Sequence, residues 1–124
     1  MNILFYAKNR SGEVIQQLIE RASPAVEVFR TLEDLTTRLH SPLDDPTVAV
    51  LVAHTREGLE ELLVIRNLFS RAWIILILPD REPETVAMGH ALRARFLTYL
   101  DGDPLEVGLV LGRMWERAEV CGHR

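Results

Sequence analysis

The sequence predicts an α/β fold in which five parallel strands form one sheet with helices packed on both faces. Strand-like runs alternate five times with amphipathic helical patterns, and this alternation is typical of βαβ units. The runs that begin at Val48 and Trp73 are apolar at every position, which a strand tolerates when helices cover both of its faces. The expected strands are Ile3–Ala7, Val26–Arg30, Val48–Ala53, Trp73–Leu78 and Phe96–Leu100.

The polarity of these runs predicts their order in the sheet. The entirely apolar runs that begin at Val48 and Trp73 belong in the centre. In the second run Glu27 lies between two valines, and this alternation indicates an edge strand. The pattern matches the order 2-1-3-4-5 of a flavodoxin-like, doubly wound sheet with five helices. A chain of 124 residues fits one domain, expected at residues 1–120 with a tail at 121–124.

Side chains that can accept hydrogen bonds from backbone N–H groups mark the starts of the first three helices. Ser11 is expected to cap the first helix, and Val14 to open its apolar face. Thr31, with Asp34 three residues on, is expected to cap the second helix. Thr55 is expected to cap the third helix.

The later helices are marked by proline and by apolar spacing. The third helix is expected to carry one apolar stripe over residues 59–69. Pro83 suits the first turn of a fourth helix, although residues 88–90 interrupt the apolar face of that helix. Asp103 and Pro104 form a strong start signal for the last helix.

Composition and charge exclude several classes of protein. The longest apolar run, Trp73–Leu78, is far shorter than the roughly 20 residues that a membrane-spanning helix needs, and the first residues lack the pattern of a secretory signal. A cytoplasmic protein is therefore expected. The single cysteine, Cys121, excludes an internal disulfide and a cysteine-rich metal site. The net charge of −4 argues against nucleic acid as a partner.

Two segments carry a family resemblance beyond the element order. The segment Gly58–Leu63 resembles the start of the third helix of the receiver domain found in bacterial two-component response regulators, and Phe96–Leu100 resembles its fifth strand. The resemblance covers essentially the whole chain. It implies a signalling module of the flavodoxin-like fold that takes part in phosphorelay signal transduction.

The residues that would perform receiver chemistry are replaced in this chain. A receiver places two acids after strand 1, a phosphoryl-accepting aspartate after strand 3, a hydroxyl after strand 4 and a lysine after strand 5, because carboxylates hold magnesium and the other groups steady the phosphoryl oxygens. The corresponding positions are Ala7 and Lys8, Val52 or Ala53, Leu78 or Pro79, and Tyr99. The resemblance therefore implies a pseudo-receiver without catalytic residues, metal or cofactor, which acts by protein contact.

A displaced acidic site is a first alternative. Asp80 and Asp101 follow the fourth and fifth strands and could rebuild a cation site with Asp44 or Asp45, although aspartates near helix starts usually act as caps. His54 follows the third strand and could accept a phosphoryl group or act as a base, although no partner for it is identified. Such a site would make the chain an atypical phosphorylated or ligand-switched receiver.

An anion site after the first strand is a second alternative. The segment from Lys8 to Gly12 contains two basic residues, Lys8 and Arg10, with Ser11 and one glycine at the start of a helix. Helix starts of this composition bind small anions or nucleotide phosphates. A solvated turn that leads into a cap is the simpler reading of the same residues.

The last helix offers a candidate interaction surface. Its two apolar stripes adjoin each other, and Gly108 and Gly112 lie one turn apart with Trp115 following. Each interior glycine costs about 1 kcal/mol relative to alanine, and close packing of this helix on the sheet is the default explanation. The alternative is a groove of small residues with Tyr99 close by, where a partner protein or a second copy of the chain docks on the fifth strand and last helix. The stripes are Leu105, Leu109, Gly112 and Val107, Leu111, Met114.

Overall fold

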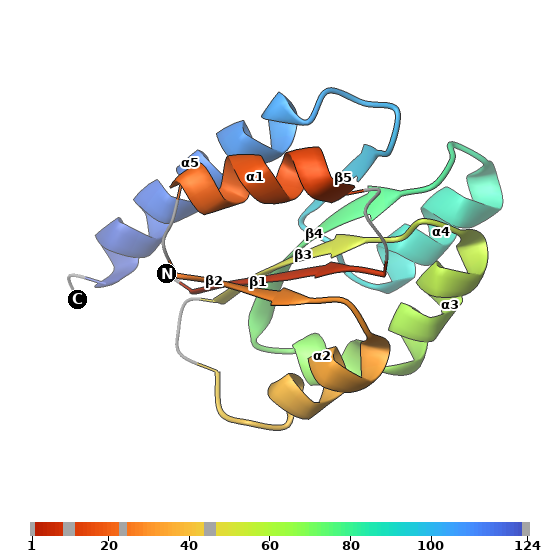
Figure 1. Ribbon diagram of the computed structural model, residues 1–124, viewed down its shortest axis with the longest axis horizontal. Helices are drawn as coiled ribbons and strands as arrows, with labels where there is room; N and C mark the ends of the chain where they lie inside the picture. The colour runs from red at the N-terminus through yellow and green to blue at the C-terminus, as the bar shows by residue number, and fades with distance from the viewer. Residues whose placement is uncertain (1, 9–11, 23–24, 44–46, 123–124) are drawn as a thin grey trace.

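A computed structural model describes residues 2–8, 12–22, 25–43 and 47–122, apart from the side chains of residues 22, 115 and 117–122. Strands and helices alternate through these ranges, as Figure 1 shows. The strands are β1 (Asn2–Ala7), β2 (Val26–Phe29), β3 (Thr47–Val52), β4 (Ala72–Leu78) and β5 (Phe96–Tyr99). The helices are α1 (Glu13–Ala22), α2 (Leu32–Leu39), α3 (Arg56–Val64), the 3₁₀ helix η2 (Arg66–Phe69), α4 (Pro83–Ala91) and α5 (Leu105–Gly122).

The strands form one parallel sheet in the order β2-β1-β3-β4-β5. Ile3 of β1 lies opposite Val26 of β2 on one side and Val48 of β3 on the other. Helices α1 and α5 cover one face, and α2, α3 and α4 cover the other (Figure 1). The flavodoxin-like, doubly wound α/β fold expected from the sequence is therefore confirmed, with β2 and β5 as the edge strands.

Two apolar cores lie on either side of the sheet, because successive side chains of a strand point to opposite faces. In β1, Ile3 and Phe5 pack toward α1 and α5, whereas Leu4 and Tyr6 pack toward α2 and α3. All six residues of β3 are buried, which explains why the sequence of this strand is apolar on both faces. The sheet thus separates two cores that share only its backbone.

The expected caps of α2 and α3 are confirmed. The amide N–H of Asp34 donates to the Thr31 hydroxyl oxygen at 3.1 Å, and the N–H of Gly58 donates to Thr55 at the same distance. Pro83 occupies the first turn of α4. Before α5, the Asp103 carboxylate accepts from the Leu105 N–H at 2.9 Å. Ser11 lies outside the described residues.

Several details of the helices differ from the sequence-based expectations. Val14 does not belong to the apolar face of α1, because it is 59% exposed while Ile15 and Ile19 turn toward the sheet. The third helix does not continue to residue 69, because α3 ends at Val64 and a separate 3₁₀ turn follows. At the other end of the chain, α5 runs through Cys121 and Gly122, where a tail was expected, and residues 123–124 lie outside the described part.

Among the residues that the structure describes, no helix combines the length and the apolar character that crossing a bilayer requires.

Candidate functional site

The carboxyl ends of the parallel strands point toward the right-hand side of Figure 1, where flavodoxin-like folds carry their sites. Ala7, Val52 and Leu78 are the last residues of β1, β3 and β4, and all three are at most 2% exposed. Ala53 follows β3, is equally buried, and donates its N–H to the Ile77 carbonyl at 2.9 Å. Four positions that the resemblance assigns to one of the two acids, to the acceptor and to the hydroxyl thus form an apolar, buried rim: Ala7, Val52, Ala53 and Leu78.

The start of α1 closes over the end of β3. A Cβ atom added at Gly12 would lie 3.1 Å from both Phe5 Cζ and Val52 Cγ2. Such distances are shorter than ordinary carbon contacts, so the backbone at Gly12 packs directly against the strand end. Glycine permits this close approach because it has no side chain. Gly12 therefore packs into the apolar rim that contains Val52.

Lys8 turns away from this rim toward α3. Its Nζ atom lies 3.2 Å from Glu61 Oε1, and both side chains are substantially exposed. Burial raises the pKa of the nearby Tyr6 hydroxyl, with the Lys8 charge lowering it and the Glu61 charge raising it. The Lys8 ammonium group is thus engaged with a carboxylate. Arg10 and Ser11, the other members of the expected anion loop, lie outside the described residues.

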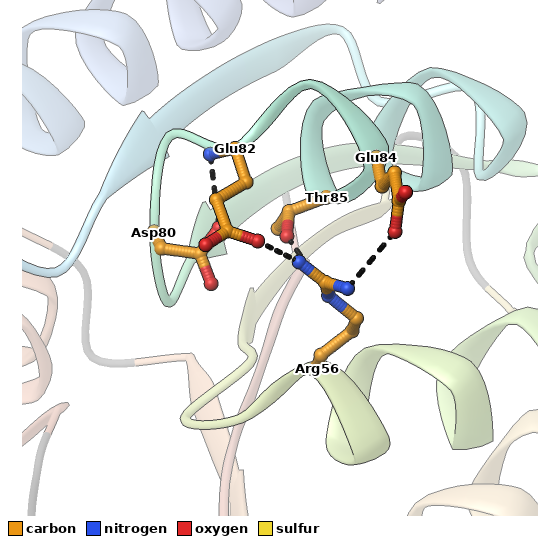
Figure 2. A network of polar contacts seen from close by, with 5 residues as sticks. All are labelled: Arg56, Asp80, Glu82, Glu84 and Thr85. Carbon is orange, nitrogen blue, oxygen red and sulfur yellow. Dashed lines mark hydrogen bonds and ion pairs between the residues drawn. The ribbon is translucent and has the colours of Figure 1, made fainter.

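Asp80 serves the start of α4, as Figure 2 shows. Its Oδ1 atom accepts the Glu82 N–H at 3.0 Å. Hydrogen bonds from the Thr85 hydroxyl and from the Glu82 amide lower the pKa of Asp80; desolvation opposes them, and the Arg56 charge adds a smaller lowering effect. Asp80 is not the cap of α4, which is Glu82, but its carboxylate fixes the turn that leads into the helix.

Arg56 joins the start of α3 to the start of α4 (Figure 2). Its Nε donates to the Thr85 hydroxyl at 3.2 Å and its Nη1 to Glu84 at 3.1 Å, while its Nη2 pairs with Glu82. Thr85 is completely buried, so the hydrogen bond satisfies a polar group that water cannot reach. Sequence reasoning did not find this network, since its members lie in two helices far apart along the chain.

Asp101 is paired with an arginine. Its two carboxylate oxygens lie 2.5 and 2.6 Å from Arg81 Nη1, and the Arg81 guanidinium stacks on the Tyr99 ring at 4.2 Å. Within the described residues, no three His, Cys, Asp or Glu side chains come together as metal ligands. Asp44 and Asp45 lie outside that part, and His54 is an exposed residue after Ala53.

The glycines of α5 do not pack closely on the sheet, contrary to the default expectation from the sequence. Val107, Leu111 and Met114 form its buried stripe, whereas Leu105 and Leu109 are 59% and 67% exposed. A Cβ atom added at Gly108 or Gly112 would have no described atom within 4 Å, apart from those of the glycine's chain neighbours and the nearby helix backbone. The two glycines are therefore not required for packing on the sheet, and that explanation is wrong.

The candidate interaction residues are not all on one face. Tyr99 packs against the core on the α2, α3 and α4 side of the sheet, whereas α5 covers the opposite side. Tyr99 therefore does not extend the exposed face of α5. The Trp115 side chain lies outside the described part of the structure. The remaining face consists of Leu105, Gly108, Leu109 and Gly112.

Comparison of the chain with protein-family models, with curated proteins and with solved structures found no match.

Proposed function

We propose that this chain is a receiver-like signalling module that works without aspartyl phosphorylation and acts by contact through α5. The observation that carries the proposal is the open face of α5, where Leu105 and Leu109 are exposed beside Gly108 and Gly112. Exposed leucines next to glycines form a surface of knobs and shallow holes, and such surfaces suit helix packing. The module is non-enzymatic and cytoplasmic.

The occupant of this face is a second copy of the chain. A two-fold interface is self-complementary, so a residue that contacts a position on the partner is itself contacted at that position. In an antiparallel pair of α5 helices, Leu109 of each copy lies opposite Gly112 of the other. The missing Cβ of glycine makes room for the leucine, and the helix axes approach closely.

The carboxyl edge of the sheet supports a mode of action that is independent of phosphorylation. The strand-end positions Val52 and Ala53 are buried and apolar, and Gly12 packs against this end of β3. Asp80 and Asp101, the acids available nearby, are engaged with a helix start and with Arg81. Phosphotransfer to aspartate needs an accessible carboxylate and a bound magnesium ion.

Sedimentation equilibrium tests the dimer. The wild-type chain is expected to dimerise as its concentration rises, and Leu109→Glu to remain monomeric, because each interface would bury two like charges without partners. Val64→Glu is the matched control, since Val64 is 82% exposed at the end of α3. A monomeric wild type at all concentrations, or equal loss of association in both variants, would refute α5-mediated dimerisation.

Amide NMR spectra with magnesium and beryllofluoride, a mimic of the aspartyl phosphate, test independence from phosphorylation. The spectra are expected to be unchanged by the additions. Localised shifts at Ala53, Leu78 and Tyr99 would instead establish a rebuilt acidic switch and contradict the proposal.

A further inference from the structure

A hollow lined by arginines lies at the amino ends of β4 and β5, on the edge of the sheet opposite the strand ends described above. Its volume is about 770 Å³. Arg66 and Arg71 reach it from η2 and the turn that follows, and Arg93 and Arg95 from the turn between α4 and β5. Buried apolar side chains of Phe69, Ile74 and Leu92 also line it.

The charged side chains that line this hollow are positive, whereas the chain as a whole is negatively charged. The whole chain carries a net charge of −4, yet none of the described residues lining the hollow is Asp or Glu. Within the described part, Arg66, Arg71, Arg93 and Arg95 form no ion pair, whereas Arg38, Arg56 and Arg81 each pair with a carboxylate. Four neighbouring cations that have no counter-charge among the described residues create a strong local positive potential, which attracts anions.

The backbone at Arg93 adopts a conformation that favours glycine. Arg93 has φ of 62° directly after the last turn of α4. Glycine is the usual residue at such a helix end because a Cβ atom destabilises the left-handed conformation. Strained positions of this kind cluster at functional sites. At this turn, the chain retains a guanidinium group where glycine would fold more easily.

Arg95 is held in place by stacking. Its guanidinium carbon lies 4.7 Å from the centre of the Trp73 ring, and its N–H donates to the Ile74 carbonyl at 2.8 Å. A stacked guanidinium keeps the N–H groups at its edge available as donors. His90, Asn67 and Ser70 add polar groups to the lining. The hollow therefore combines four exposed cations, one of them oriented by stacking, with further polar side chains.

We infer that this hollow binds a small molecule carrying a diphosphate or triphosphate group. Guanidinium groups bind phosphate oxygens in pairs, so four of them match the charge and donor demand of two or more linked phosphates. The volume lies within the range of roughly 300–1,000 Å³ typical of small-molecule sites. A long nucleic acid fits less well, because it needs an extended basic face and the chain is acidic overall. This site is separate from the segment that contains Lys8 and Gly12.

Isothermal titration calorimetry with inorganic tripolyphosphate, ADP, AMP and adenosine tests the inference on the full chain. Tripolyphosphate and ADP are expected to bind once per chain, AMP about tenfold more weakly than ADP, and adenosine not at all. Added salt is expected to weaken binding. A further titration with inorganic diphosphate separates the sources of the phosphates. Tighter binding of ADP than of inorganic diphosphate would identify a nucleotide as the source, and equal binding would identify the phosphate group alone.

Arg93→Gly separates binding from folding. It is expected to weaken tripolyphosphate binding about tenfold or more, while raising the melting temperature by about 3–5 °C through relief of the backbone. Arg71→Gln, at an exposed position, is expected to weaken binding similarly. Arg21→Gln on α1 is the matched control, since it removes the same charge outside the hollow and should leave affinity within about twofold.

Three results would overturn the inference. The first is the absence of binding heat with tripolyphosphate at millimolar concentration. The second is an equal loss of affinity in Arg21→Gln and Arg71→Gln, which would mean attraction without a defined site. The third is binding of a single-stranded oligonucleotide that tripolyphosphate does not displace, which would mean a nucleic-acid surface.

Discussion

Replacing Gly108 and Gly112 with alanine should stabilise the protein. A Cβ atom at either position meets open space in the described structure. Alanine is favoured over glycine in a helix interior by about 1 kcal/mol. Gly112 lies in the helix interior and should give nearly this amount, whereas Gly108 ends the first turn and should give about half. The double variant should therefore gain about 1.5 kcal/mol, or roughly 5 °C in melting temperature.

Urea unfolding followed by circular dichroism measures this gain. The experiment belongs at low protein concentration, because self-association adds stability that depends on concentration. Gly89→Ala is the comparison variant, since a Cβ atom there would meet Leu97 Cδ2 at 3.0 Å on a buried face of α4. Its gain should be smaller than that of Gly112→Ala, or reversed, because the neighbouring leucines must shift.

A loss of stability in the double alanine variant would refute the reasoning, because it would mean that the space beside α5 is filled. The same variant also bears on the dimer. Filling the glycine positions should weaken association while the monomer becomes more stable, so the two effects have opposite signs. A variant that gains stability and dimerises as well as the wild type would show that the leucines alone hold the interface.

Three further changes probe the site and its supports. Gly12→Ala should lower the free energy of unfolding in urea by about 1–3 kcal/mol, because the new methyl group would press on Phe5 and Val52. Unchanged stability would mean that α1 lies further from β3. Asp80→Asn should make the free energy of unfolding depend less on pH in acid. The pKa of Asp80 is lowered in the folded state, so the ionised carboxylate stabilises the fold above the ordinary pKa of 3.8. This stabilisation is lost as the pH falls through the lowered pKa of the folded state. Parallel stability curves for the variant and the wild type below pH 3.8 would contradict that role. Thr31→Ala should cost about 1 kcal/mol by thermal unfolding, and an unaltered melting temperature would mean that the capping bond contributes nothing.

Local patterns in the sequence predicted the sheet and several helix starts. Each strand boundary lies within one residue of its expected place, because alternating and apolar runs report directly on burial. Thr31 and Thr55 were predictable as caps because a hydroxyl before an apolar helix has few other roles. These features depend on residues close together in the chain.

The candidate sites depend on residues far apart in the chain, and local patterns do not predict their convergence. The glycines of α5 suggested close packing, but only the structure shows that they face away from the sheet. The arginine hollow joins η2 to the turn after α4, and these segments meet only because β4 and β5 are neighbours. One signal was present: residues 62–79 and 85–100 contain arginines but neither Asp nor Glu.

The interior place of β1 in the sheet imposes an order on folding during synthesis. Ile3 pairs with Val48 as well as with Val26, so β1, which is synthesised before β3, keeps one edge unpaired until β3 has emerged from the ribosome. Until then, a nascent chain with only β1 and β2 offers an apolar strand with open backbone groups, a template for pairing with other chains. A pause in synthesis while β1 and β2 are outside the ribosome and β3 is not should therefore increase aggregation, whereas a pause after β3 has formed should be tolerated.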